Sequence, residues 1–166
     1  MVVCELKPHK EDPNRTRITV AGSKICYPGD VGTPTGSLDP VKLIINSVLS
    51  RRNARFVCFD LKKFYLQTLM ERSEYLRINL SDIPHKFIKE YDLTQSVQNR
   101  WIYFEIFRGC YGLQQSGRLA NDLLRTRLEK EVYYEAATKP GLWSHKWRPI
   151  QFFLLVEEFG IEYVGK

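Results

Sequence analysis

Two continuous apolar runs, each ending in carboxylates, dominate the pattern of hydrophobic and polar positions along the chain. The first run, residues 56–59, ends in Asp60, and the second, residues 152–156, ends in Glu157 and Glu158. A short continuous apolar run predicts a strand that is buried on both faces of its sheet. A glycine and a shorter β-prone run follow the second stretch, so we expect a hairpin with both glutamates at or near its turn.

Two helices are predicted from apolar positions that recur every three or four residues. Asp39 as N-cap and Pro40 as the first helical residue begin the first one. Its apolar stripe consists of Val41, Ile44, Ile45, Val48 and Leu49. The second helix begins near Gln115 or Ser116 and buries a leucine-rich face. Its opposite face is basic and carries Arg118, Arg125, Arg127 and Lys130.

The remaining elements are shorter. Alternating or aromatic-rich runs predict strands at 16–20, 74–78 and 101–107, and a short helix is expected over 84–91. Glycine and proline make 27–36 a loop. This order predicts an α+β fold, in which two main helices pack on one face of an antiparallel sheet.

The carboxylates at the strand ends have two interpretations. Asp60 either pairs with a neighbouring cation such as Lys62 or Arg55, or it holds a metal ion. The two glutamates either keep a hairpin tip soluble or take part in the same site. If the two predicted strands pair, Asp60 and Glu157 converge at one end of the sheet. Converging carboxylates repel each other, so we expect a divalent cation such as Mg²⁺ there.

Composition narrows the class of protein. The chain has 166 residues, of which 43% are hydrophobic and 27% charged, as in an ordinary globular protein with one core. The net charge of +6 is compatible with an anionic partner such as nucleic acid. The four cysteines, at positions 4, 26, 58 and 110, lack the spacing of a zinc site, so we expect buried free thiols in a reducing compartment.

The N-terminal segment lacks the basic and apolar regions of a signal peptide. The longest apolar run has five residues, so we expect no membrane span. An intracellular location, in the cytoplasm or the nucleus, is therefore expected.

Three segments, in this order, resemble the reverse transcriptase domain of copia-type retrotransposons with long terminal repeats. Residues 59–66 (FDLKKFYL) are similar to the first palm motif of that family. Residues 111–118 (YGLQQSGR) are similar to its segment leading into the palm helix, and residues 156–160 (VEEFG) stand in the place of its two-aspartate hairpin. The resemblance runs from about residue 15 to the end of the chain, and it implies an RNA-directed DNA polymerase.

The resemblance also implies a division of the chain. Residues 1–166 would form a single reverse-transcriptase-like domain with the polymerase fingers-palm fold. Fingers elements would lie over about 1–55 and 70–110, and palm elements over about 37–68 and 111–166. The thumb and ribonuclease H parts of the family follow the hairpin and are expected to be absent here.

In this family, two divalent metal ions carry nucleotidyl transfer. By resemblance, Asp60 would be the shared ligand of two Mg²⁺ ions, with Mn²⁺ as a substitute. Glu157 and the backbone carbonyl of Leu61 would complete the ligand set, and Glu158 would be the third catalytic carboxylate.

The resemblance further implies a nucleotide site and its partners. Tyr65 would reject a 2′-hydroxyl on the incoming nucleotide, Gln115 would lie near that nucleotide, and Arg17 would hold its triphosphate. The partners would be an RNA or DNA primer-template and deoxynucleoside triphosphates.

The hairpin departs from the family pattern because Glu157 and Glu158 replace two aspartates. The extra methylene moves each carboxylate by about 1 Å, and Mg²⁺ requires near-ideal geometry. Such a displacement costs on the order of a hundredfold in rate, so we expect weak or absent polymerase activity. One alternative is a non-catalytic nucleic-acid-binding remnant that uses basic residues such as Arg15, Arg17, Lys62 and Lys63. A decayed reading frame without selected function is another.

Overall fold

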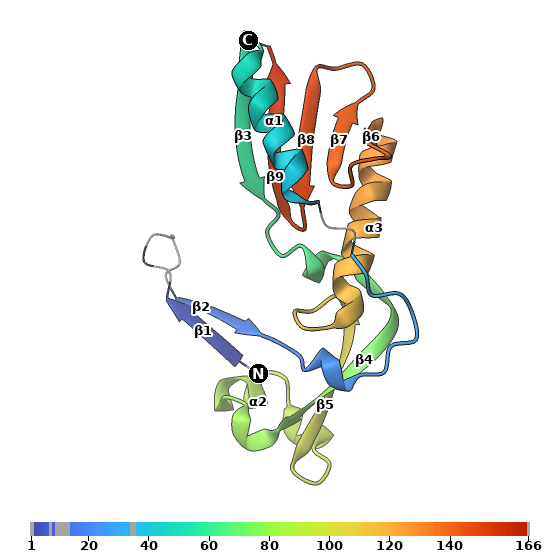
Figure 1. Ribbon diagram of the computed structural model, residues 1–166. Coiled ribbons are helices and arrows are strands. Elements are labelled where there is room, and N and C mark those ends of the chain that lie inside the picture. The colour runs from blue at the N-terminus through green and yellow to red at the C-terminus, as the bar shows by residue number, and fades with distance from the viewer. Residues whose placement is uncertain (1, 7, 9–13, 34–35, 166) are drawn as a thin grey trace.

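The computed structural model describes the chain apart from residues 1, 7, 9–13, 34–35 and 166, and it leaves the side chains of residues 2–6 and 14–17 undescribed. The molecule is elongated (Figure 1). A five-stranded sheet with one helix in front of it forms one end, and two-stranded ribbons form the other. A long helix runs between the two ends. The fold is therefore α+β with antiparallel sheets, as the order of the elements predicted.

The five-stranded sheet has the order β3-β9-β8-β7-β6, and every neighbouring pair is antiparallel. The strands are β3 (Ala54–Asp60), β6 (Tyr133–Glu135), β7 (Leu142–His145), β8 (Ile150–Leu155) and β9 (Glu158–Val164). The predicted hairpin is confirmed, since β8 and β9 are joined by the two-residue turn at 156–157.

The prediction that the first apolar run is buried on both faces is wrong. β3 is the edge strand of the sheet, and its side chains are exposed from Arg55 to Asp60. Only β9 pairs with it among the described strands, so a continuous apolar run occupies a position that alternating runs usually take.

Helix α1 (Leu38–Ser50) covers one face of the sheet at β3, β9 and β8. Its N-cap is Ser37, whose hydroxyl oxygen accepts a hydrogen bond from the N–H of Asp39 at 3.3 Å. The predicted cap, Asp39, lies in the first turn instead, and its carboxylate pairs with Lys139 at 2.8 Å. Serine and aspartate are about equally good N-caps, so the pattern of apolar residues could not decide between Ser37 and Asp39.

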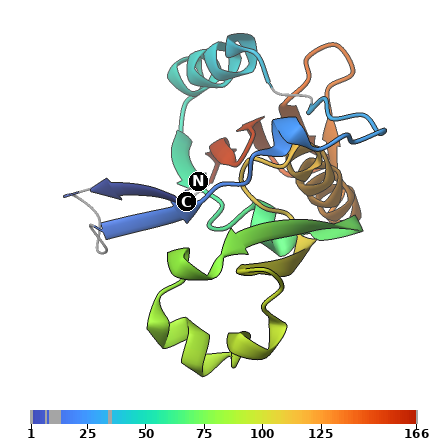
Figure 2. The ribbon, with the colours of Figure 1, turned by 90° about the horizontal axis from the view of Figure 1, so that it is seen from below.

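The second long helix, α3 (Gln114–Lys130), packs on the opposite face of the sheet. Leu124 and Leu128 contact a buried cluster made of Trp143, Phe152, Leu154 and Phe159. Successive strand residues point to opposite faces, so Glu162 lies on the other face, where Ser47 of α1 donates a hydrogen bond to it at 2.9 Å. The prediction that both helices pack on one face is therefore wrong, and Figure 2 shows them on either side of the strands.

The other end of the molecule is built from two hairpin ribbons. One pairs β1 (Val2–Leu6) with β2 (Asn14–Ile18), and the second pairs β4 (Leu69–Asn79) with β5 (Trp101–Arg108). The short helix α2 (His85–Glu90) lies between β4 and β5 in the chain. The predicted strands at 74–78 and 101–107 and the helix within 84–91 are confirmed. The described residues also form four 3₁₀ helices, at Gly22–Lys24, Tyr65–Gln67, Leu80–Asp82 and Leu93–Ser96.

The cysteine side chains that the structure describes are free thiols. Cys26 and Cys58 are exposed, and Cys110 is half-buried. The expectation of burial is wrong for Cys26 and for Cys58, which lies on the edge strand. The side chain of Cys4 lies outside the described residues. None of the described helices combines the length and apolar content needed to cross a bilayer.

Candidate functional site

The acidic residues of the two apolar runs meet at one end of the large sheet. Asp60 is the register partner of Glu158 at the end of the β3–β9 ladder. The N–H of Leu61 donates a hydrogen bond to the carbonyl oxygen of Glu157 at 2.9 Å. This bond makes Asp60 and Glu158 a non-hydrogen-bonded pair, in which Cα atoms lie only about 4.5 Å apart. Their side chains therefore start from neighbouring positions on the same face of the sheet.

The hairpin turn holds the third carboxylate beside this pair. Val156 and Glu157 form the turn between β8 and β9, and Val156 has a φ of 57°. A left-handed conformation suits a two-residue hairpin turn but is costly for a β-branched side chain. Such strain persists only where the surrounding structure imposes it, and it is frequent at functional sites. The turn thus fixes the position of Glu157 next to the ends of β3 and β9.

Neither interpretation of Asp60 is realised by the side chains as they lie. The ion pairs of the described residues do not join Asp60 to Lys62 or to Arg55. Within the part of the chain that the structure describes, no three acidic, histidine or cysteine side chains converge closely enough to hold a metal ion. Asp60 and Glu158 are both exposed. The strand ends bring the carboxylates into one neighbourhood, but the side chains do not form a finished cage.

Tyr65 connects this acidic end to the helix α3 region. Partial burial raises the pKa of the Tyr65 hydroxyl, and the negative charge of Glu157 and the neighbouring Tyr111 raise that pKa further. The rings of Tyr65 and Tyr111 meet edge to face, with centroids 5.3 Å apart. The charge of Glu157 therefore affects the Tyr65 hydroxyl, while the Tyr65 ring contacts the segment that leads into α3.

A cavity of about 260 Å³ lies beside Tyr65 at the start of α3. Its lining consists of Tyr65, Cys110, Tyr111, Gly112, Leu113, Gln114, Ser116 and Gly117. The Ser116 hydroxyl oxygen accepts a hydrogen bond from the N–H of Cys110 at 3.0 Å, which holds the lining segment against the helix. The first N–H groups of a helix have no partner within it and favour anionic ligands.

Glycines make the close packing around this cavity possible. Gly112 has a φ of 92°, and a Cβ there would collide with the carbonyl oxygen of Val20. A Cβ on Gly109 would likewise collide with the carbonyl oxygen of Tyr65. The N–H of Val20 donates to the carbonyl oxygen of Tyr111 at 2.9 Å. The segments before β4, after β5 and after β2 are thus tied together at the cavity.

The structure describes the side chain of Gln115 but not that of Arg17, the other residue of the implied nucleotide site. Gln115 is fully buried, and its Nε2 donates to Glu74 of β4 at 3.3 Å, so it does not line the cavity. Tyr111 and Gln114 line the cavity in its place, and sequence reasoning missed both. Both belong to residues 111–118, the segment that carries part of the resemblance, and this was the signal available for them. The backbone of Arg17 lies in β2, but its side chain lies outside the described residues.

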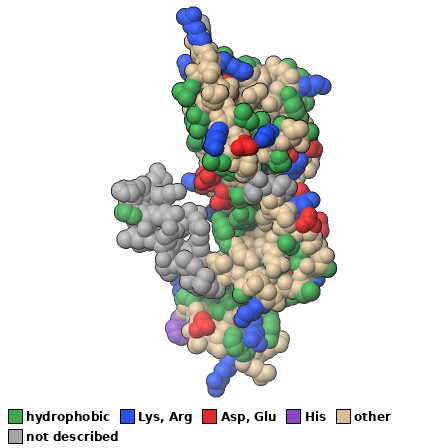
Figure 3. All heavy atoms as spheres, viewed as in Figure 1, with side chains coloured by type: hydrophobic (Ala, Val, Ile, Leu, Met, Phe, Trp, Pro, Cys, Tyr) green, Lys and Arg blue, Asp and Glu red, His purple; other side chains and the backbone are tan. Residues whose placement is uncertain are grey.

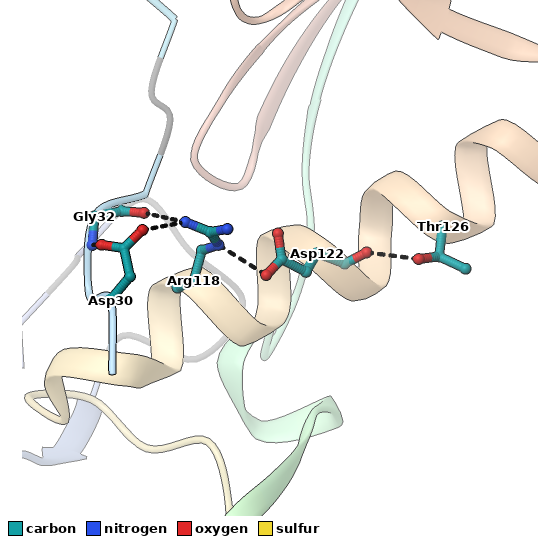
Figure 4. Close-up of polar contacts among 5 residues, drawn as sticks. All are labelled: Asp30, Gly32, Arg118, Asp122 and Thr126. Carbon is teal, nitrogen blue, oxygen red and sulfur yellow. Dashed lines mark hydrogen bonds and ion pairs between the residues drawn. The ribbon is translucent and has the colours of Figure 1, made fainter. Parts of the chain in front are cut away.

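A loop before α1 is fastened to α3 beside the cavity (Figure 4). The Arg118 guanidinium donates to Asp30 at 2.7 Å, to the carbonyl oxygen of Gly32 at 3.2 Å and to Asp122 at 2.8 Å. A hydrogen bond from the N–H of Gly32 and the charge of Arg118 hold the pKa of Asp30 below its usual value. The loop is therefore anchored one helical position beyond the cavity lining.

The predicted basic face of the second helix is partly neutralised. Arg118 pairs with two aspartates, and Arg125 pairs with Glu135 at 2.6 Å. Arg127 and Lys130 remain exposed. Figure 3 shows lysine and arginine side chains at both ends of one face of the molecule rather than in one continuous stripe. The described side chains thus present a dispersed positive charge.

Three features therefore lie together at the junction between the large sheet and the ribbons. They are the acidic end of β3 and β9, Tyr65, whose pKa is raised by the charge of Glu157, and the cavity at the start of α3. This arrangement presents carboxylate oxygens on one side and the N–H groups of a helix start on the other. No protein-family model matches the chain, and no curated protein or solved structure matches it.

Proposed function

We propose that this chain is a nucleotidyl-transfer domain of the reverse transcriptase class, with a fingers-palm fold, from a copia-type retrotransposon with long terminal repeats. The carrying observation is the pairing of Asp60 with Glu158 in the β3–β9 ladder, with Glu157 in the adjoining turn. Three carboxylates far apart in the sequence come to one strand end, as two-metal nucleotidyl transfer requires.

The opposed carboxylates support a cation site. Like charges directly across an antiparallel pair destabilise a sheet. Oxygen ligands of this kind suit Mg²⁺ and Mn²⁺, so a divalent cation relieves the repulsion between Asp60 and Glu158. Binding has to draw the side chains inward, since they do not converge as they lie. The cation, when bound, would activate a primer hydroxyl and stabilise the leaving pyrophosphate.

The cavity beside Tyr65 is the proposed nucleotide site. The cavity lies at the start of α3, and the N–H groups of a helix start favour an anionic group such as a triphosphate. Tyr65 stands between this cavity and Glu157, so a sugar would sit against its ring. Gln115 has a structural role in this proposal, because its hydrogen bond to Glu74 joins α3 to β4. A primer-template would then lie across the junction between the sheet and the ribbons.

Metal binding tests this proposal most directly. In calorimetry, the unaltered protein should bind Mg²⁺ or Mn²⁺, and Asp60→Asn should weaken binding by at least about tenfold, which corresponds to about 1.4 kcal/mol. Asp82→Asn is the matched control, because Asp82 is an exposed aspartate of the ribbon end. No binding by the unaltered protein, or equal binding by Asp60→Asn, would contradict the proposed cation site.

A non-catalytic nucleic-acid-binding remnant is the second candidate, favoured by the absence of a finished metal cage among the described residues. It predicts RNA or DNA binding that falls steeply with salt and does not change with divalent metal or with Asp60→Asn. Filter binding of a labelled primer-template, with and without Mg²⁺, separates the two functions.

A further inference from the structure

An exposed tryptophan that the proposed function does not use lies at the far end of the large sheet. Residues 146–149 connect β7 to β8, at the end of the sheet opposite to Asp60 and Glu158 (Figure 1). Trp147, in this connection, keeps 66% of its surface exposed. Tryptophan is on average one of the more buried residue types, and it is enriched where proteins contact other molecules. Trp147 is therefore a candidate contact residue.

Buried His145 holds the connection in a defined shape. Its ring nitrogen Nδ1 accepts hydrogen bonds from the N–H of Trp147 at 3.2 Å and from the N–H of Arg148 at 3.1 Å. The His145 ring also meets the indole of Trp147 edge to face, with centroids 5.2 Å apart. The indole is thus supported from one side while most of its surface stays open. A side chain positioned in this way loses little conformational entropy when a ligand binds.

Backbone hydrogen bonds also join the connection to the elements on either side of it. The N–H of Lys146 donates to the carbonyl oxygen of Val132, just beyond α3, at 3.1 Å. The N–H of Val164, the last residue of β9, donates to the carbonyl oxygen of Pro149 at 3.2 Å. Val164 is in turn the register partner of Ala54, at the start of β3. The connection therefore lies between the end of α3 and the start of β3.

Exposed cations from all three of these segments surround Trp147. They are Lys146 and Arg148 of the connection, Arg127 and Lys130 of the last turn of α3, and Arg52 and Arg55 beside the start of β3. Lys146 Nζ lies 5.9 Å from the centroid of the Trp147 ring. None of these cations forms an ion pair with another described side chain. Figure 3 shows lysine and arginine side chains at this end of the molecule. We call the connection and these cations the Trp147 surface.

The acidic residues at the same end do not neutralise these cations. Among the described residues they are Glu129, Glu131 and Glu162. Glu162 is buried and pairs with Arg51 at 3.4 Å, so Arg51 is not counted among the unpaired cations. Glu129 and Glu131 are exposed, but the unpaired cations outnumber them. The Trp147 surface therefore has a surplus of positive charge around one exposed indole.

We propose that the Trp147 surface binds single-stranded nucleic acid. An unpaired base stacks on the indole of Trp147, and the phosphates on either side of that base contact the cations. The bases of a duplex already stack on one another, so a duplex does not offer this contact. An anionic membrane requires a larger apolar face, whereas Trp147 and Pro149 are the only apolar residues of the connection. The inference goes beyond the proposed function, since it requires neither a metal ion nor catalysis.

Removal of the indole tests the stacking contact. The measurement is fluorescence anisotropy of a labelled oligothymidylate, made in the presence of a metal chelator. Trp147→Ala should raise the dissociation constant by about tenfold, because one base–aromatic stack is lost, and Trp147→Phe should restore part of the affinity. Tyr91→Ala is the matched control, because Tyr91 is an aromatic residue that is 65% exposed at the ribbon end. Circular dichroism checks that each variant is folded.

The salt dependence of binding tests the phosphate contacts. Each phosphate contact on a single strand contributes about 0.7 to the slope of log affinity against log salt. Lys146→Gln together with Arg148→Gln should therefore make this slope shallower by about 1.4. Lys86→Gln together with Lys89→Gln is the matched control, because both lysines are exposed on α2.

The chelator removes any cation from the carboxylates at the other end of the sheet, so a failure of the proposed polymerase function leaves these results unchanged. No binding of oligothymidylate by the unaltered protein would overturn the proposal. So would equal losses of affinity in Trp147→Ala and Tyr91→Ala, or equally tight binding of a duplex. Binding to phosphatidylserine vesicles that depends on Trp147, without binding to oligothymidylate, would assign the Trp147 surface to a membrane instead.

Discussion

At the scale of single residues, the departure of this chain from the polymerase pattern rests on one methylene in each hairpin carboxylate. Val156 holds the turn in a left-handed conformation, so the backbone of Glu157 cannot shift freely to compensate for a longer side chain. Burial raises the pKa of the Tyr65 hydroxyl, and the negative charge of Glu157 raises that pKa further, so the two side chains belong to one electrostatic neighbourhood. Side-chain length should therefore decide how well the site binds a cation.

Shortening both side chains should restore activity if the proposed function is correct. Glu157→Asp together with Glu158→Asp should raise primer extension in Mg²⁺ by about tenfold to a hundredfold, because the carboxylates move back by about 1 Å. Extension of a labelled primer on an RNA template is the measurement. The same double variant carrying Asp60→Asn should remain inactive. Robust extension by the unaltered protein would show that the glutamates do not weaken the site.

At the scale of elements, the cavity depends on three segments that approach each other through glycine. Gly112→Ala combines a φ of 92° with a collision between Cβ and the carbonyl oxygen of Val20. We expect it to lower the free energy of unfolding by about 1–3 kcal/mol or more, as measured by urea denaturation. Gly165→Ala is the matched control, because nothing lies within 4 Å of its Cβ position. Equal stability of the two variants would mean that the segments can separate at little cost.

The sequence predicted the helices and strands better than it predicted which strands lie side by side and which face of the sheet each helix covers. Periodicity located α1, α3 and the β8–β9 hairpin because it depends on neighbouring positions in the chain. It did not show that β3 is an edge strand, since a strand does not encode how many neighbours it has. An apolar stripe likewise does not say which face of a sheet it covers, so α3 was placed on the wrong one. The sequence predicted that the ends of the two apolar runs converge, and the pairing of Asp60 with Glu158 shows this, but it did not show that Gln115 is buried against Glu74.

At the scale of the whole molecule, two surface ion pairs connect parts that are distant in the chain. Asp30 joins the loop before α1 to Arg118 of α3, and Asp39 joins α1 to Lys139 beyond β6. A hydrogen bond from Lys139 and its charge hold the pKa of Asp39 below its usual value. The N–H of Gly32 and the charge of Arg118 lower the pKa of Asp30 in the same way. Both aspartates are exposed, so each ion pair contributes little to the stability of the fold. One pair involves α3 and the other involves α1, so the two helices on either side of the sheet are each fixed by one of them.

Acid should therefore loosen this packing. Both aspartates have a lower pKa in the folded protein than the value of about 3.9 in an unfolded chain. Their contribution to stability is present above that unfolded value and is lost as the pH falls through the folded values. The double variant Asp30→Asn with Asp39→Asn should thus be slightly less stable at pH 7 and should lose less stability than the unaltered protein as the pH falls below about 4. Urea midpoints measured at a series of pH values give both slopes, with Asp82→Asn as the control. If the double variant and the unaltered protein lose stability in parallel, these two ion pairs do not contribute to stability in solution.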